Sequence, residues 1–197
     1  MTHISNIPHI LKYGIVRADS PNRNINYINI GDPRIIEIRK DLDYLGKKLS
    51  NFIPFYFGYR SPMLYVIQNG YNNLPQVNPE DIIYIVIRLE DLIIDSVDCV
   101  FTDGHALNEF TRFYPKDKLT EINNIISPAD IFADQWSSPN DPDLKRRKEA
   151  ELLVEKDLHP KYIHAFAVYN ENAKRKLVDL NISSERIFVL PRYYYSV

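Results

Sequence analysis

Polar and apolar residues follow two different periods along the chain. Between residues 5 and 13 the apolar positions are three or four apart, Pro8 falls in the first turn and Gly14 follows the last one. This pattern predicts a short helix that ends at the glycine. Residues 16–26 are polar, contain Pro21 and three asparagines, and are expected to form a loop.

Runs rich in β-branched and aromatic residues predict the strands, and helical spacing predicts the remaining helices. Short strands mixed with helices of uneven length are typical of an α+β fold rather than of a regular doubly wound sheet. The expected strands cover residues 53–57, 63–68, 82–90, 99–102, 164–169 and 186–190. The expected helices cover residues 34–45, 104–113, 141–150 and 172–180.

The stretch from residue 114 to residue 142 has no clear period. It contains three prolines before Pro142 and the only tryptophan of the chain, Trp136. A loop of this length inside a compact domain is usually functional or disordered. The embedded tryptophan favours a functional loop.

The composition is that of an ordinary globular chain. With 197 residues, 45% hydrophobic and 25% charged, it is expected to form one domain over residues 1–197. No run approaches the roughly 20 apolar residues of a membrane span, and the first residues do not resemble a secretory signal. Cys99 is the single cysteine, so no internal disulfide can form. We expect a monomeric protein of the cytoplasm without membrane association.

The formal charge of −2 argues against a generic nucleic-acid-binding protein, because such proteins are usually basic. Any contact with nucleic acid would have to come from a local groove and from bases stacking on aromatic rings. That mode of binding suits single strands.

Common catalytic motifs are absent. The sequence has no GxGxxG, GxxxxGK[ST], HExxH or GxSxG, which are the usual marks of nucleotide-binding, metalloprotease and hydrolase sites. None of the five histidines stands at a metal-ligand spacing from another histidine, cysteine or acid. No metal is therefore expected.

Glu151 is an acid within an otherwise apolar stretch. If residues 146–158 formed one helix, it would share an arc of about 120° with apolar side chains, at about 100° per residue. If a strand begins there instead, it faces the same way as Leu153. From the pattern alone, a salt bridge to Arg147 at the rim of the core is the simpler explanation. In the helical arrangement Glu149 would point elsewhere, and it is expected to be dispensable.

A second cluster of interest begins at the Gly-Asp-Pro turn of residues 31–33. A helix after this turn would project Arg34, Arg39 and Lys40, and arginine side chains match the oxygens of phosphate groups well. From the pattern alone a solvated basic face is the simpler explanation here, as it is for Arg60.

Five segments, in order and at compatible spacing, resemble the DarT family. They are HISNIPHILKYG, INIGDPRIIEIR, IPFYFGYRSPMLY, FTDGHAL and RRKEAELLV, and they span nearly the whole chain. Members ADP-ribosylate DNA and are restrained by a cognate DarG macrodomain antitoxin. The resemblance implies an ADP-ribosyltransferase fold, in which NAD is held between two small sheets. It also implies that the acceptor is single-stranded DNA, with thymidine as the expected base and guanosine as the main alternative.

The resemblance also assigns residues. It makes Glu151 the catalytic acid and Arg39 the catalytic arginine. Members usually have several residues before the matching histidine, whereas here His3 is almost at the start. The positions expected to hold NAD are Thr2, His3, Ile4, Asn6 and Arg39. The positions expected beside the DNA are Arg60, Met63, Leu64, Tyr65, His105 and Trp136.

Two alternative functions remain open from the sequence. A related transferase could keep the NAD chemistry and act on RNA or protein. A catalytically inactive module could keep the fold and capture a nucleotide or nucleic acid.

Overall fold

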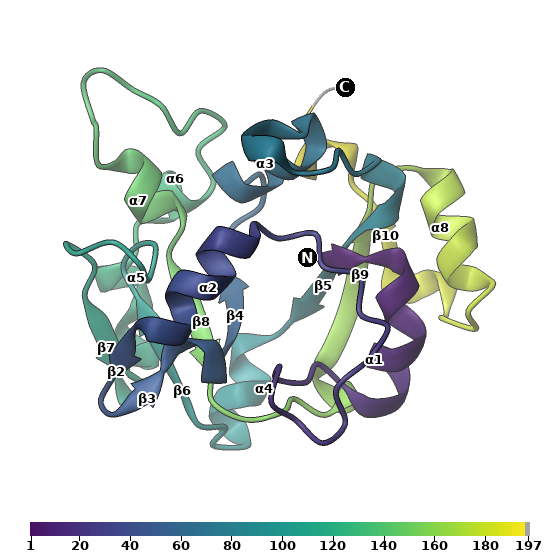
Figure 1. The fold of residues 1–197 in the computed structure, drawn as a ribbon, viewed down its shortest axis with the longest axis horizontal. Coiled ribbons are helices and arrows are strands. Elements are labelled where there is room, and N and C mark those ends of the chain that lie inside the picture. The colour runs from purple at the N-terminus through teal and green to yellow at the C-terminus, as the bar shows by residue number, and fades with distance from the viewer. Residues whose placement is uncertain (196–197) are drawn as a thin grey trace.

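The computed structural model describes residues 1–195, so the last two residues of the expected domain, 196 and 197, lie outside the described part. Two four-stranded sheets form the centre of the molecule and are flanked by helices (Figure 1). This mixture of short strands and helices confirms the expected α+β class.

The strand order is β1-β5-β9-β10 in the first sheet and β4-β8-β6-β7 in the second. Strands β9 and β10 run parallel, and the other neighbours run antiparallel. The first sheet contains β1 (Thr2–His3), β5 (Ile82–Ile87), β9 (Ile163–Val168) and β10 (Ile187–Val189). The second contains β4 (Ile53–Tyr56), β8 (Glu151–Val154), β6 (Cys99–Thr102) and β7 (Phe113–Pro115). A separate hairpin is formed by β2 (Asp43–Tyr44) and β3 (Lys47–Lys48).

Two helices cover the first sheet. Ile7 and Ile10 of α1 and Ala173 and Leu177 of α8 pack in one buried cluster with Phe166 of β9. Burying side chains of this size contributes about 1.5–3 kcal/mol each relative to leaving them exposed. The helices are α1 (Ile7–Tyr13), α2 (Pro33–Asp41), α3 (Pro62–Asn69), α4 (Leu89–Ile94), α5 (Ile122–Ile125), α6 (Pro128–Ile131), α7 (Leu144–Lys148) and α8 (Glu171–Val178).

Strand β8 lies inside the second sheet and is buried along its whole length. Leu152 and Val154 pack into one cluster, whereas Leu153 packs on the other face with Leu49 and Phe52. Of the two arrangements that the sequence left open for Glu151, the strand is therefore the one observed.

Gly14 ends α1, as predicted, with φ of 85° and its N–H donating to the carbonyl of Ile10 at 2.8 Å. Its position leaves no room for a side chain, because a Cβ would lie 2.0 Å from the carbonyl oxygen of Leu158. Ile15 pairs with Leu158 through two backbone hydrogen bonds. The glycine therefore lets the end of α1 lie directly against the chain that follows β8.

Most other predicted elements are present. The expected strands over residues 53–57, 99–102, 164–169 and 186–190 correspond to β4, β6, β9 and β10, and three of the expected helices correspond to α2, α7 and α8. The expected strand over 82–90 is too long, since β5 ends at Ile87 and α4 begins at Leu89.

The strand predicted over residues 63–68 is wrong, because this segment is helix α3. The Ser61 side chain caps it by accepting from the N–H of Leu64, Pro62 begins it, and Gly70 ends it in the left-handed conformation. These end signals are those of a helix. They outweigh the β-branched and aromatic content of the apolar run between them.

The helix predicted over residues 104–113 is also wrong. Turns replace it: the N–H of Asn108 donates to the carbonyl of His105, and the Asn108 side chain accepts from the N–H of Phe110. Asparagine side chains commonly compete with a helix in this way. The stretch after β7, expected to be irregular, contains α5 and α6.

Among residues 1–195, every helix is too short or too polar to cross a bilayer.

Candidate active site

Glu151 is the first residue of β8, where it pairs in register with Tyr56 of β4. Its side chain is completely buried. One carboxylate oxygen accepts a hydrogen bond from the backbone N–H of Ala106 at 3.0 Å. A charged group in such a place needs partners for its remaining lone pairs.

Arg39 supplies those partners. Its Nη2 lies 2.9 Å from one Glu151 oxygen and its Nη1 lies 3.3 Å from the other, which makes a two-pronged ion pair. The arginine is in the last turn of α2, a helix capped by the Asp32 carboxylate and begun by Pro33. Two residues 112 positions apart in the sequence therefore meet because α2 lies against the start of β8.

Thr102 fixes the backbone of Glu151. Its hydroxyl accepts from the Glu151 N–H at 3.0 Å and lies 2.7 Å from the carbonyl oxygen of Gly104, to which it donates. Thr102 is itself completely buried. The Thr102 side chain thus provides the hydrogen bond to the backbone of Glu151 at the point where the backbone pairing between β6 and β8 ends.

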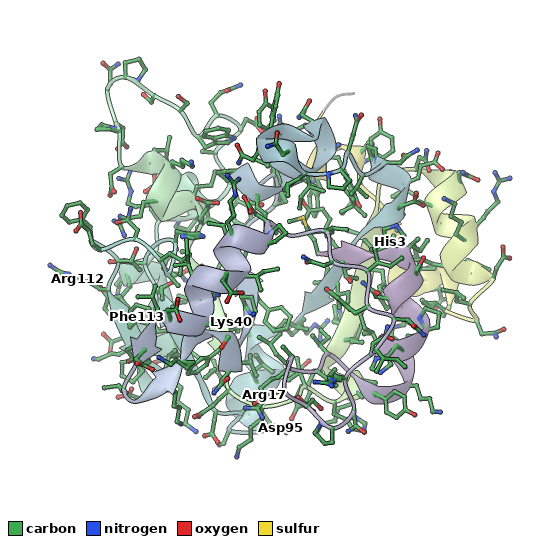
Figure 2. The ribbon with its side chains drawn as sticks, viewed as in Figure 1. His3, Arg17, Lys40, Asp95, Arg112 and Phe113 are labelled. Carbon is green, nitrogen blue, oxygen red and sulfur yellow. The ribbon has the colours of Figure 1, made fainter. Side chains whose placement is uncertain are left out.

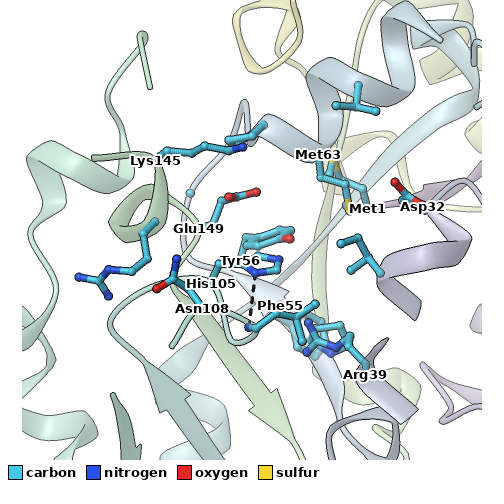
Figure 3. A pocket seen from close by; sticks show the side chains of 18 of the residues that line it. Met1, Asp32, Arg39, Phe55, Tyr56, Met63, His105, Asn108, Lys145 and Glu149 are labelled. Carbon is cyan, nitrogen blue, oxygen red and sulfur yellow. Dashed lines mark hydrogen bonds between the residues drawn. The ribbon is translucent and has the colours of Figure 1, made fainter. Parts of the chain in front are cut away.

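A cavity of about 820 Å³ has Arg39 in its wall (Figure 3). Its volume lies within the range of about 300–1,000 Å³ that is typical of small-molecule sites. Arg39 and Tyr56 form part of its wall, so Glu151 sits directly behind the wall. Other charged or titratable side chains around it are Asp32, Tyr84, His105, Asp143, Lys145, Arg146 and Glu149.

Glu149 faces this cavity next to Lys145 (Figure 3), so the expectation that it points elsewhere is wrong. Only 7% of it is exposed. Burial raises the pKa of its carboxyl to about 7, a shift to which the neighbouring Glu151 adds and which Lys145 and Lys148 oppose. The cavity therefore contains a carboxyl that changes charge near neutral pH.

His105 also lines the cavity. Its Nδ1 accepts from the backbone N–H of Leu107 at 3.4 Å (Figure 3), which leaves Nε2 as the nitrogen that carries the proton of a neutral ring. Burial lowers the pKa of His105, although the nearby Glu151 acts in the opposite direction. Burial and the charges of Glu151 and Glu149 raise the pKa of Tyr56.

The four N-terminal positions expected to hold NAD are not among the residues that line this cavity. Figure 2 shows His3 on the side of the molecule that carries α1, and Lys40 on helix α2. The His3 ring accepts a hydrogen bond from the N–H of Ser5 at 3.2 Å. The Asn6 amide bonds to Thr2 and to the backbone of Ile28. Asn6 therefore holds the loop at Ile28 against β1. Ile4 is half-buried.

The residues expected beside the DNA fall into three groups. Met63 lines the cavity, as His105 does. Leu64 is completely buried in the core, so its side chain cannot contact DNA and this assignment is corrected. Tyr65, Trp136 and Arg60 lie outside the lining and close to one another: the Tyr65 ring meets the Trp136 ring edge-on at 5.9 Å.

Comparison with known proteins decides the family. The family described as ssDNA thymidine ADP-ribosyltransferase, DarT, matches residues 1–195. The chain belongs to the DarT family. It is an NAD-dependent ADP-ribosyltransferase that acts on single-stranded DNA.

Individual relatives and solved structures support the assignment to the DarT family. A DNA ADP-ribosyl transferase of Escherichia coli O127:H6 is 31% identical over 180 residues, which cover 90% of this chain and 82% of the relative. Thermus sp. 2.9 DarT in complex with ADP-ribosylated ssDNA superimposes with a TM-score of 0.82 at 27% identity, covering 98% of this chain and 93% of that one. The same protein in complex with NAD+ gives a TM-score of 0.79 at 27% identity, with 98% and 94% covered. Thermosipho africanus DarTG in complex with ADP-ribose gives 0.81 at 29% identity, with 98% of this chain and 50% of that one covered.

The sequence alone missed three side chains of this DarT site. Glu149 and Lys145 line the cavity, and Thr102 holds Glu151. Local spacing gave no signal for Glu149, because it caps the end of α7 with φ of −95° and ψ of 25° and precedes the extended segment of β8. Among residues 1–195, no group of three or more histidine, cysteine or acidic side chains could hold a metal ion.

Proposed function

We propose that Glu151 is the catalytic acid of the transfer. When the bond between nicotinamide and ribose breaks, nicotinamide leaves with the electron pair and positive charge develops at the anomeric carbon. A fixed carboxylate stabilises that charge. A nitrogen of the acceptor base then bonds to the same carbon, and Glu151 takes the proton which that nitrogen loses. The observation that carries this proposal is the ion pair between the buried Glu151 and Arg39, which forms part of the cavity wall.

Arg39 would orient NAD or the acceptor base. In the structure, the Arg39 guanidinium lies between Glu151 and the cavity. For the carboxylate to reach the anomeric carbon, the guanidinium has to turn from Glu151 to the substrate. The diphosphate of NAD or a base carbonyl would replace the carboxylate as its partner. The pair would thus keep the carboxylate covered until the substrate is bound.

The acceptor in this proposal is a thymidine base. Its ring nitrogen is engaged in pairing in a duplex, so a single strand is needed. Met63 and His105 line the cavity, as do Gly58 and Pro62 on either side of the turn at Arg60, and the strand would lie against these residues. With a charge of −2, the protein would bind the strand by local stacking and few phosphate contacts.

In the cell, this chain would be the toxin of a toxin–antitoxin pair. Its relative from Thermosipho africanus is a fusion of a DNA ADP-ribosyl transferase and a DNA ADP-ribosyl glycohydrolase. By analogy, we assign this chain a DarG-type macrodomain partner that restrains it. It would act as a monomer in the cytoplasm, where NAD and DNA are both present, and its residues 1–197 would fold as one domain.

The test is to incubate the protein with NAD, a pool of single-stranded oligonucleotides that each lack one base, an RNA pool and a carrier protein. Fragmentation mass spectrometry then locates the ADP-ribose. Adducts on thymidine of DNA alone are expected. Adducts on guanosine, RNA or protein, or none at all, would overturn the proposed acceptor.

The same assay tests the catalytic residues. Glu151→Gln keeps the size of the side chain and should lower kcat at least about 10²-fold, the lower end of the effect of a positioned proton acceptor. Arg39→Ala should lose at least about tenfold, with a raised KM for NAD. Glu185→Gln makes the same chemical change at an exposed position. It is the matched control and should keep wild-type activity.

A further inference from the structure

The end of the described chain lies against the face that carries Arg60 and Trp136. The Tyr195 hydroxyl donates to the backbone carbonyl of Arg60 at 2.5 Å and accepts from Nε1 of Trp136 at 3.1 Å. A phenol has one proton and two lone pairs, so it can make both bonds at once. One hydroxyl therefore joins the turn after β4 to the segment between α6 and α7, although these partners lie 135 and 59 residues away in the sequence.

The backbone of Tyr195 is held in place as well. The Gln68 side chain, at the end of α3, donates to the Tyr195 carbonyl at 3.2 Å and accepts from the Tyr195 N–H at 3.0 Å. Gln68 is only 2% exposed. Because a buried amide fixes its backbone in this way, the Tyr195 ring has little freedom to move away from its partners.

The ring itself contacts the same group of residues. The Arg60 guanidinium lies over it with 4.8 Å between guanidinium carbon and ring centroid, and the Tyr65 ring meets it edge-on at 5.0 Å. Arg60 also pairs with Asp134, two residues before Trp136, at 2.8 Å. Three side chains that the DarT resemblance places beside the DNA thus share one neighbour near the end of the chain.

Tyr195 remains a hydrogen-bond donor in neutral solution. Burial raises the pKa of its phenol to about 12, with Glu149 and Tyr65 adding to the shift and Trp136 and Arg60 opposing it. The phenol is therefore protonated at neutral pH and can donate the hydrogen bond that joins the two segments.

We propose that Tyr195 is a positioning residue for the single-stranded DNA, because its phenol fixes the spacing between the Trp136 ring and the turn at Arg60. A strand bound across this face would stack bases on Trp136 and Tyr65 and place a phosphate near Arg60. Small errors in such spacing weaken a substrate's placement strongly. This inference rests on the proposed function, since the roles of these three residues beside DNA come from the family resemblance.

The decisive variant is Tyr195→Phe, which removes the hydroxyl and keeps the ring. Trp136 is the only tryptophan, so intrinsic fluorescence reports directly on it. We expect its emission to shift to the red and its quenching by acrylamide to increase. The KM for a thymidine-containing single-stranded oligonucleotide should rise at least about fivefold, because both hydrogen bonds of the phenol are lost. The KM for NAD and kcat at saturating oligonucleotide should change by less than about twofold.

Two further variants sharpen the test. Trp136→Phe removes the indole donor from the other side, and its effect on the oligonucleotide KM should not add to that of Tyr195→Phe, because both changes break the same bond. Tyr193→Phe is the matched control: within residues 1–195 its hydroxyl makes no hydrogen bond, so fluorescence and kinetics should match the wild type.

Unchanged Trp136 fluorescence in a folded Tyr195→Phe protein would overturn the inference, and so would additive effects of the two variants. An effect confined to kcat or to the KM for NAD would also overturn it. A wild-type protein that modifies no DNA would instead refute the proposed function. In that case the fluorescence change, together with titration of the oligonucleotide, still decides whether Tyr195 positions Trp136 for binding.

Discussion

Arg39 and Glu151 form a two-pronged ion pair in which the carboxylate is completely buried and the arginine side chain is 11% exposed. The Ala106 N–H adds a third hydrogen bond to the carboxylate. A pair of this kind has two consequences. It keeps a charged carboxylate in a place from which water is excluded, and it makes each partner dependent on the other.

The first prediction follows from that dependence. Arg39→Gln leaves the Glu151 carboxylate buried with a weaker partner, and should lower the free energy of unfolding by about 3–5 kcal/mol. Glu151→Gln in the same protein removes the buried charge, so the double variant should be more stable than Arg39→Gln alone. Urea denaturation of the wild type, both single variants and the double variant measures the coupling. Strict additivity of the two single effects would contradict a mutual dependence of the pair.

The second prediction concerns the threonine behind the carboxylate. Thr102→Val keeps the shape and removes the acceptor of the Glu151 N–H, which is then buried without a partner. This should cost about 1–3 kcal/mol, or roughly 2–12 °C in Tm for a chain of this length. Activity should fall as well, since the start of β8 is no longer fixed. Thr120→Val, at an exposed position, is the control for differential scanning calorimetry and should leave Tm unchanged.

Five of the eight strands in the two four-stranded sheets could be predicted from the sequence because they are apolar runs bounded by turns, as in β5 and β9. For β8 the sequence left strand and helix both open, and strands β1 and β7 were missed because they are only two and three residues long. The segment that became α3 was misassigned for a physical reason. Its interior contains β-branched and aromatic residues that suit either element, and only Ser61, Pro62 and Gly70 at its ends mark it as a helix.

The site was predicted less completely. Arg39 and Glu151 were assigned from the family resemblance, because nothing local in the sequence indicates that they meet. Glu149 was misjudged because its orientation was inferred from a single continuous helix over residues 146–158. In the structure α7 ends at Lys148, and Glu149 lies in the short link before β8, where neither helical nor strand periodicity applies.

The third prediction tests how the segment that carries Trp136 is held against β4. A Cβ on Gly58 would lie 2.4 Å from the backbone oxygen of Ile131, at the end of α6. Backbone cannot yield as a flexible side chain does, so Gly58→Ala should displace α6 and destabilise the protein by about 1–3 kcal/mol. The oligonucleotide KM should rise along with it. The Lys148 ammonium also donates to this oxygen, at 3.0 Å, and that bond would be strained too.

The control for the third prediction is Gly31→Ala. There the nearest atom to a new Cβ would be an Asn29 side-chain oxygen at 3.4 Å, an ordinary contact. Its Tm should stay within about 2 °C of the wild type, the shift that a few tenths of a kcal/mol produce. Equal losses of Tm in the two alanine variants would mean that contact with Ile131 is not the cause.

The fourth prediction uses the titration of Glu149. Its pKa is raised from 4.5 to about 7 by burial, so the folded protein holds a proton that the unfolded chain releases between these two values. The contribution of this group to stability is therefore highest below pH 4.5, falls as pH rises to about 7, and then stays constant. Glu149→Gln cannot lose a proton. Its Tm relative to the wild type should increase by several degrees from pH 5 to pH 8, whereas that of Glu185→Gln should not.

The same titration should appear in substrate binding, because Glu149 and Lys145 both face the cavity. Above pH 7 the carboxylate opposes the positive charge of Lys145 and Arg39, and it repels the anionic diphosphate of NAD. The wild-type KM for NAD should therefore rise between pH 6 and pH 8 at a fixed, saturating oligonucleotide concentration. Glu149→Gln should show a flatter profile, since its side chain stays neutral. If both proteins gave the same pH profile of KM, the charge of Glu149 would have no part in binding NAD, and its raised pKa would matter for stability alone.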